Sequence, residues 1–163
     1  MLPVDETMRA LYTALMQAGY KAVGPRKVGE EILYGVLDNP DDLLLGTVIP
    51  SNTLKEFFFP KHEVLFTYQP VKNDVTLADA PREFPKTAFL AVRPCDAAGL
   101  AALDKLFGWD YDDNFYLERR KNSLIVSLAC DEPLAECFCH QAGRHPASTE
   151  GADEPMKSIV GNV

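Results

Sequence analysis

The chain has few of the features that mark nucleic-acid-binding, membrane or secreted proteins. Its 16 lysines and arginines against 24 aspartates and glutamates leave a net charge of −8, and the densest basic run is ERRK at 118–121. An acidic chain of this kind is not a nucleic-acid binder by bulk electrostatics. No stretch reaches the ~18 to 20 apolar residues of a membrane span, and the start, MLPVDETMRA, lacks the basic and apolar regions of a signal peptide. We therefore expect a cytoplasmic protein.

Cysteine is scarce as well, with only four residues, Cys95, Cys130, Cys137 and Cys139. Structural disulfides are rare in a reducing cytosol, and the ring that would join Cys137 to Cys139 across one residue is strained. The thiols are therefore expected to bind metal, to carry out redox chemistry or to be inert core residues. If all four lie in one site, they would indicate the chemistry of that site.

What is present is typical of a globular protein. An apolar fraction of 47% and a charged fraction of 25% over 163 residues predict a single domain, 1–163, with its own core and a polar C-terminal tail from about residue 143. Apolar residues at helical spacing predict a helix over 5–18. The Gly24–Pro25 pair is expected to break the chain before the next element.

Four further segments are expected between residues 32 and 87. ILYGVL at 32–37 and LLLGTVI at 43–49 are expected to be strands that form a hairpin around the turn signal DNPDD. The aromatic-rich segment 51–68 predicts a short helix or turn followed by a strand, with phenylalanines in the core. Residues 69–87, with three prolines and scattered charges, predict a surface connection.

The second half of the chain predicts a parallel βαβ unit. TAFLAV at 87–92 and SLIVSLA at 123–129 are continuous apolar runs, which are typical of strands buried on both faces. Between them lie a helical segment at 97–107 and a possible helical turn, FYLERRK, at 115–121. The predicted fold class is α/β, with a small mixed or parallel sheet, a right-handed βαβ unit around residues 87–130 and flanking helices.

This topology predicts that the four cysteines form one site. Cys95 follows the first of the two strands and Cys130 ends the second, so parallel strands would bring both to the sheet edge where α/β proteins bind ligands. The segment DEPLAE, stiffened by Pro133, then leads to Cys137 and Cys139 and is short enough to fold back over that edge.

Four thiolates are a sufficient ligand set for a [4Fe–4S] cluster or for tetrahedral zinc. The spacing C-x34-C-x6-C-x-C matches neither the ferredoxin run nor a paired CxxC zinc pattern. Apolar neighbours at 92, 128 and 138 favour a cluster, which functions in a dry shell. His140 and His145 leave a Cys3His zinc site open, and buried, inert Cys95 and Cys130 are a further alternative.

Other residues near the cysteines have both a functional and an ordinary interpretation. Asp96, Asp131 and Glu136 would lower a cluster's reduction potential, or they are helix caps, with Asp96 at the start of helix 97–107. Cys139 with His140 as a nucleophile and base is a remote alternative, since adjacent residues on a strand point in opposite directions.

Five basic residues also have both a functional and an ordinary interpretation. Arg93, Arg119 and Arg120 would pair with acidic groups near the cluster or with an anionic partner, or they form ordinary salt bridges. Lys61 and His62 are expected on the surface, where they could line a partner interface.

Three stretches resemble one protein family: FFFPKHEVLFTY (57–68), VRPCDAAGLAALDKLF (92–107) and YLERRKNSLIVSLACDEPLAECFCHQAGRHPASTEGAD (116–153). They are similar to the amino-terminal region of the iron–sulfur β subunit of soluble sulfhydrogenase-type nickel–iron hydrogenases, which the A subunit of anaerobic sulfite reductase shares. The resemblance covers roughly residues 45–153. The order of RPCD, the following LD..F, the double arginine, the cysteine after the apolar strand and CFC gives it its specificity.

The resemblance implies an electron-transfer subunit, itself non-catalytic, in a cytoplasmic oxidoreductase complex. It supports Cys95, Cys130, Cys137 and Cys139 as ligands of one [4Fe–4S] cluster, with zinc as the alternative cofactor. The implied partners are other oxidoreductase subunits: a flavoprotein, a ferredoxin-like protein or a hydrogenase-type catalytic subunit. Family members continue into a module with two CxxCxxCxxxCP runs, which these 163 residues lack. The chain is thus expected to be a stand-alone version, a fragment or a domain with a separate ferredoxin partner, and a non-redox scaffold is the alternative function.

Overall fold

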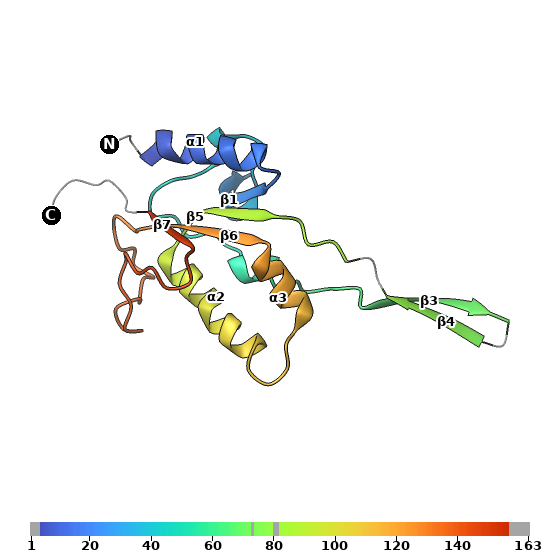
Figure 1. Cartoon of the computed structure of the whole chain (residues 1–163). Helices are drawn as coiled ribbons and strands as arrows, with labels where there is room; N and C mark the ends of the chain where they lie inside the picture. Colours follow the sequence, from blue (N-terminus) through green and yellow to red (C-terminus); the bar gives the residue numbers. More distant parts are fainter. Residues whose placement is uncertain (1–3, 73, 80–81, 157–163) are drawn as a thin grey trace.

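A five-stranded mixed sheet forms the centre of the structure, which is a computed structural model that describes residues 4–72, 74–79 and 82–156 (Figure 1). The strand order is β2-β1-β5-β6-β7, with bounds Glu31–Val36, Lys21–Val28, Thr87–Val92, Ser123–Leu128 and Glu154–Met156 in that order. Only the β1–β2 pair is antiparallel. None of the helices in these residues is long and apolar enough to cross a membrane.

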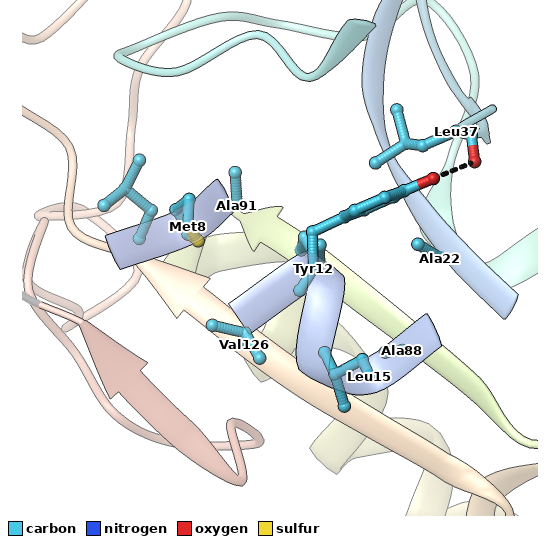
Figure 2. Close-up of a cluster of buried hydrophobic side chains, with 10 residues drawn as sticks. Met8, Tyr12, Leu15, Ala22, Leu37, Ala88, Ala91 and Val126 are labelled. Atoms are coloured by element: carbon cyan, nitrogen blue, oxygen red, sulfur yellow. Dashed lines mark hydrogen bonds between the residues drawn. The ribbon is translucent and has the colours of Figure 1, made fainter. Parts of the chain in front are cut away.

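One face of the sheet is covered by helix α1 (Val4–Gln17). Its buried residues Met8, Tyr12 and Leu15 pack on small and branched side chains of the strands, as Figure 2 shows, and the Tyr12 hydroxyl donates to the Leu37 carbonyl at 3.2 Å. These three residues lie at the 3–4 residue spacing that places side chains on one helical face. The helix predicted over 5–18 is therefore confirmed.

The opposite face is covered by helices α2 (Pro94–Phe107) and α3 (Asn114–Lys121) and the short 3₁₀ turn η2 (Leu54–Phe57). A second core cluster fills this layer, with Phe58, Phe89 and Tyr116 among its most buried members. β5, α2, α3 and β6 together form the predicted βαβ unit, since β5 and β6 are parallel neighbours. The α/β class and the mixed sheet are therefore confirmed.

The predicted hairpin of 32–37 with 43–49 is wrong. β2 pairs instead with β1, in a register that includes Pro25↔Tyr34, while 43–49 is irregular after the 3₁₀ turn η1 (Pro40–Asp42). The Gly24–Pro25 pair does not break the chain, because β1 pairs with β5 only through Val23 and the proline lies beyond that ladder. Gly24 is required by close packing: a Cβ there would lie 2.5 Å from Leu43 Cδ1.

The segment 69–87 is not simply a surface connection. Residues Phe66–Val71 (β3) and Asp74–Asp79 (β4) form a two-stranded antiparallel sheet that extends away from the body of the molecule (Figure 1). The short helix or turn and the strand expected within 51–68 are present as η2 and the start of β3. The tail also contains structure, since β7 adds a parallel strand beside β6.

Candidate metal centre at the strand ends

A bulge in β5 sets the direction in which the chain approaches Cys95. Phe89 pairs with Ile125 and Val92 with Ser127, so β5 holds one residue more than β6 between these pairs, and Ala91 has a φ of 51°. As a result Ala91 packs with the α1-side core and Val92 with the α2-side core. Helix α2 starts two residues later at Pro94, which puts the exposed Cys95 in its first turn.

A partly buried polar network fixes the same turn. The Asp96 carboxylate accepts from Arg93 Nε at 2.8 Å and Nη2 at 3.2 Å, and from the Tyr34 hydroxyl at 2.7 Å. Burial, and then the charge of Asp96, raise the pKa of Tyr34 well above its usual value. Because Tyr34 is only 3% exposed, the network ties β2 to the residue that follows Cys95.

Cys130 lies at the end of β6, where two segments hold the chain. Its N–H donates to the Pro146 carbonyl at 3.1 Å. The N–H groups of Asp131 and Glu132 both donate to the Thr47 hydroxyl oxygen, at 3.0 and 3.2 Å. The irregular segment that was predicted to be a strand thus anchors the backbone immediately after Cys130.

Local hydrogen bonds shape the loop that carries the other two cysteines. The Leu134 N–H donates to Cys137 Sγ at 3.3 Å, and the Cys137 N–H donates back to the Leu134 carbonyl at 3.0 Å. The Arg144 N–H donates to the Cys139 carbonyl at 2.8 Å. Cys137 is exposed and Cys139 half-buried, while Phe138 between them is 67% exposed. The loop is therefore a set of tight turns that presents an aromatic ring to solvent.

The electrostatics of Cys130 connect all four cysteines. Burial first, and then the negative charge of an ionised Cys95, raise its pKa to about 11, and Cys137 and Cys139 act in the same direction. Arg93 opposes them. Charge interactions of this kind act over short distances. The strand ends and the loop thus bring the three other thiols within electrostatic range of Cys130.

The pKa of Cys95 is also raised, by burial and next by the charge of Asp96, against the opposing charge of Arg93. The residue as a whole is exposed, so this desolvation concerns the part of the side chain that faces the protein. Both thiols at the strand ends are thus held in the protonated form by their surroundings. A bound cation would reverse that preference, because metals bind the thiolate.

Within the described residues, no three histidine, cysteine, aspartate or glutamate side chains are arranged to hold a single metal ion. The donor set itself, four thiols of which two are exposed, fits iron–sulfur or zinc chemistry.

Of the interpretations offered for the flanking residues, capping is wrong for Asp131 and Glu136, because no helix follows either one. Asp96 lies inside the first turn of α2, and its carboxylate bonds to side chains rather than to the helix amides. His140 and His145 pack edge to face with ring centroids 6.0 Å apart. In the described part of the chain neither is hydrogen-bonded to a thiol, so the nucleophile hypothesis for Cys139 gains no support.

Among the five basic residues, Arg93 acts on the thiols at the strand ends and lowers the pKa of both Cys95 and Cys130. Arg120 pairs with Asp104 at 3.2 Å and Asp153 at 3.5 Å, and Arg119 pairs with Glu63. For these two the ordinary salt-bridge interpretation is the one that the contacts favour.

Lys61 pairs with Glu56 at 3.1 Å, and His62 is exposed, so the expected surface position of both is confirmed. Sequence reasoning missed Tyr34 and Thr47. Each contacts the site from a segment more than 45 residues earlier in the chain, and neither has a local sequence signal.

A comparison with curated proteins finds the Sulfhydrogenase 2 subunit beta of Pyrococcus furiosus, which is 30% identical to this chain over 142 residues. The match covers 85% of this chain and 40% of that subunit. The predicted resemblance to the β subunit of sulfhydrogenase is therefore confirmed, and the chain spans well under half of that relative's length. No family model matches the chain, and no solved structure does.

Proposed function

We propose that this chain is an electron-transfer component of an oxidoreductase complex and that it holds one [4Fe–4S] cluster. The ligands are Cys95, Cys130, Cys137 and Cys139. The broader part of the proposal rests on the relation to a sulfhydrogenase β subunit, which its name makes one subunit of an assembly. The finer part rests on where the cysteines lie.

The observation that supports the cluster is the position of Cys95 and Cys130 just after two adjacent parallel strands. The carboxyl ends of such strands form the edge at which α/β sheets bind ligands. Cys137 and Cys139 come from the following loop, and their negative charge, when ionised, also raises the pKa of Cys130. These are all the cysteines in the chain, which supports one shared role.

The residues around the thiols would tune a bound cluster, which supplies reversible one-electron exchange. Exposed Asp131, Glu132 and Glu136 place negative charge on the loop, which disfavours the more negative reduced form. Arg93 and the amino-terminal end of α2 place positive charge near Cys95 and act in the opposite direction. Because Arg93 is itself neutralised by Asp96, we expect the acidic residues to dominate and the potential to be low.

A single cluster transfers electrons only if a second redox centre is close. The exposed Phe138, between two of the ligands, marks the face on which such a centre would approach. The partners that we propose are other oxidoreductase subunits: a flavoprotein, a ferredoxin-like protein or a hydrogenase-type catalytic subunit. In this role the chain is not itself the catalyst.

The first test is purification without oxygen, followed by an absorption spectrum and iron and sulfide analysis. We expect a brown protein with about four irons and four sulfides per chain. Cys137→Ser and Cys95→Ser should each abolish or convert the cluster. The chain has no cysteine outside the site to act as a control, so His140→Ala and His145→Ala serve instead and should leave iron content unchanged.

Two results would overturn the cluster. A colourless protein with about one zinc per chain, which a histidine variant also loses, would indicate a Cys3His site in a scaffold. Failure of anaerobic reconstitution, with no metal bound, would show that the four thiols are not one ligand set. If Cys95→Ser leaves the cluster unchanged, Cys95 at the end of β5 is not one of its ligands.

A further inference from the structure

In the described part of the chain, the two-stranded sheet β3–β4 carries a concentration of exposed apolar side chains. Every residue of both strands is exposed. Phe66, Tyr68, Val75 and Leu77 are 57%, 67%, 53% and 65% exposed. Among the described residues β3 and β4 pair only with each other, and Figure 1 shows them projecting from the body. We call this sheet the hairpin.

The register of the hairpin gathers these side chains on one face. Tyr68 lies opposite Leu77, Pro70 opposite Val75 and Phe66 opposite Asp79. Directly opposed residues, and residues two apart along a strand, share a face of an antiparallel sheet. One face therefore carries five apolar side chains and a single charge at its base, while the other carries Thr67, Gln69, Val71, Asp74, Thr76 and Ala78.

Such a face is not stable in water by itself. An isolated two-stranded hairpin is marginal at best, and independent stability normally needs a third strand or a covered apolar face. Nothing in the described part of the chain covers this one. The alternation of apolar and polar residues over both strands is the pattern of a half-buried sheet. The sequence is thus built for a partner surface.

We propose that the occupant of this face is the same face of a second copy of the chain, so that two hairpins pack face to face around a two-fold axis. The face is self-complementary in the sense that a two-fold interface requires. With its axis between the two Tyr68–Leu77 pairs, the Pro70–Val75 tip of one copy meets the Phe66–Asp79 base of the other. The only charge then lies at the rim, where it stays hydrated.

The area available matches a weak, reversible dimer. Two aromatic and three aliphatic side chains exposed to this degree present roughly 400–500 Å² of apolar surface on each copy. A face-to-face pair would bury about 900 Å² in total, close to the ~1,000 Å² at which specific interfaces begin. We therefore expect dissociation constants in the micromolar range or weaker.

Charge gives the dimer a characteristic salt dependence. Each copy carries a net charge of −8, so the two repel each other, while the contact itself is apolar. Added salt screens the repulsion and leaves the apolar contact intact. The dissociation constant should therefore fall as salt is raised, whereas a contact with a charge-complementary partner would weaken.

The test is sedimentation equilibrium on the full chain, with a reductant present so that exposed cysteines form no intermolecular disulfide. Wild type is compared with Leu77→Asp and with Thr76→Asp. The two variants introduce the same charge at neighbouring positions on the same strand, but on opposite faces. Hydrogen exchange of the β3 and β4 amides is measured on the same samples at low and high protein concentration.

We expect wild type and Thr76→Asp to form a reversible dimer and Leu77→Asp to raise the dissociation constant by at least ~30-fold, as loss of a central interface residue does. Protection of the hairpin amides should rise with concentration in the first two proteins only. A wild type that stays monomeric at millimolar concentration would overturn the proposal. So would equal effects of Leu77→Asp and Thr76→Asp, or a dimer that Leu77→Asp leaves intact.

Discussion

Asp96→Asn tests whether the turn that carries Cys95 is held by the partly buried network of Asp96, Arg93 and Tyr34. The side chains of Arg93 and Asp96 are 20% and 19% exposed, and the carboxylate accepts three hydrogen bonds. The asparagine side chain keeps the shape of aspartate but loses its charge. Its NH2 group would face the donors of Arg93 or Tyr34 and could not accept their hydrogen bonds. Arg93 is then left without its counter-ion in a mostly buried position.

The expected loss in the free energy of unfolding is about 2–3 kcal/mol. Removing one partner of a fully buried ion pair costs roughly 3–5 kcal/mol, and the partial exposure of both groups reduces that figure. For a chain of 163 residues this corresponds to a melting temperature lower by about 5–10 °C. Urea denaturation of the metal-free protein, followed by circular dichroism, gives the free energy directly.

Two companion variants make the result specific. Tyr34→Phe removes one donor but leaves the ion pair, so it should cost only about 1 kcal/mol. Asp38→Asn removes an exposed carboxylate 3.4 Å from Arg26 and should change the free energy by less than about 0.5 kcal/mol. If Asp96→Asn is no worse than Asp38→Asn, the network does not hold the turn and the reasoning fails.

The remaining predictions concern the tail and the thiols. In urea denaturation, Gly151→Ala should destabilise the protein by about 2 kcal/mol more than Gly19→Ala. Both glycines have a φ of +79°, but only at 151 would the added Cβ meet backbone, 2.0 Å from the Ala97 carbonyl oxygen. Equal losses would mean that the tail is not packed on α2. In metal-free protein at pH 8, iodoacetamide should modify the exposed Cys137 at least ~10-fold faster than Cys130, whose pKa is about 11, and mass spectrometry measures both rates. Equal rates would contradict the burial of Cys130. Because burial raises that pKa from 9 in the folded state, the contribution of Cys130 to stability should be constant below pH 9 and should fall between about pH 9 and 11 by no more than ~1–2 kcal/mol. Cys130→Ala should remove this part of the decline, which unfolding curves of wild type and variant over that pH range would show.

Sequence patterns determined the parts of this protein whose signal is local. The continuous apolar runs at 87–92 and 123–129 are typical of strands covered on both faces, and the segment between them is long enough for a parallel crossover. From that topology alone, Cys95 and Cys130 had to end at one edge of the sheet. The confirmed resemblance to a sulfhydrogenase β subunit rested on the same stretches.

Other elements were decided by contacts between distant segments. The Gly24–Pro25 pair lies inside a strand because the pairing of β1 with β5 ends at Val23, so the missing proline N–H faces no ladder. The apolar segment 43–49 is irregular, and β2 pairs with β1 instead. Strand pairing is a property of two segments at once, and a single segment's composition cannot reveal which partner it finds.

The surroundings of the candidate site show the same division. The sequence by itself pointed to Cys95, Cys130, Cys137 and Cys139 as candidate metal ligands, because they are the four cysteines of the chain and two of them follow predicted strands. Only the tertiary structure decided what holds them: Thr47 accepts two backbone N–H groups after Cys130, and Tyr34 reaches Asp96 across 62 residues of sequence. Hydrogen bonds of this kind depend on where the folded backbone places donors and acceptors, and that is fixed only once the core has packed.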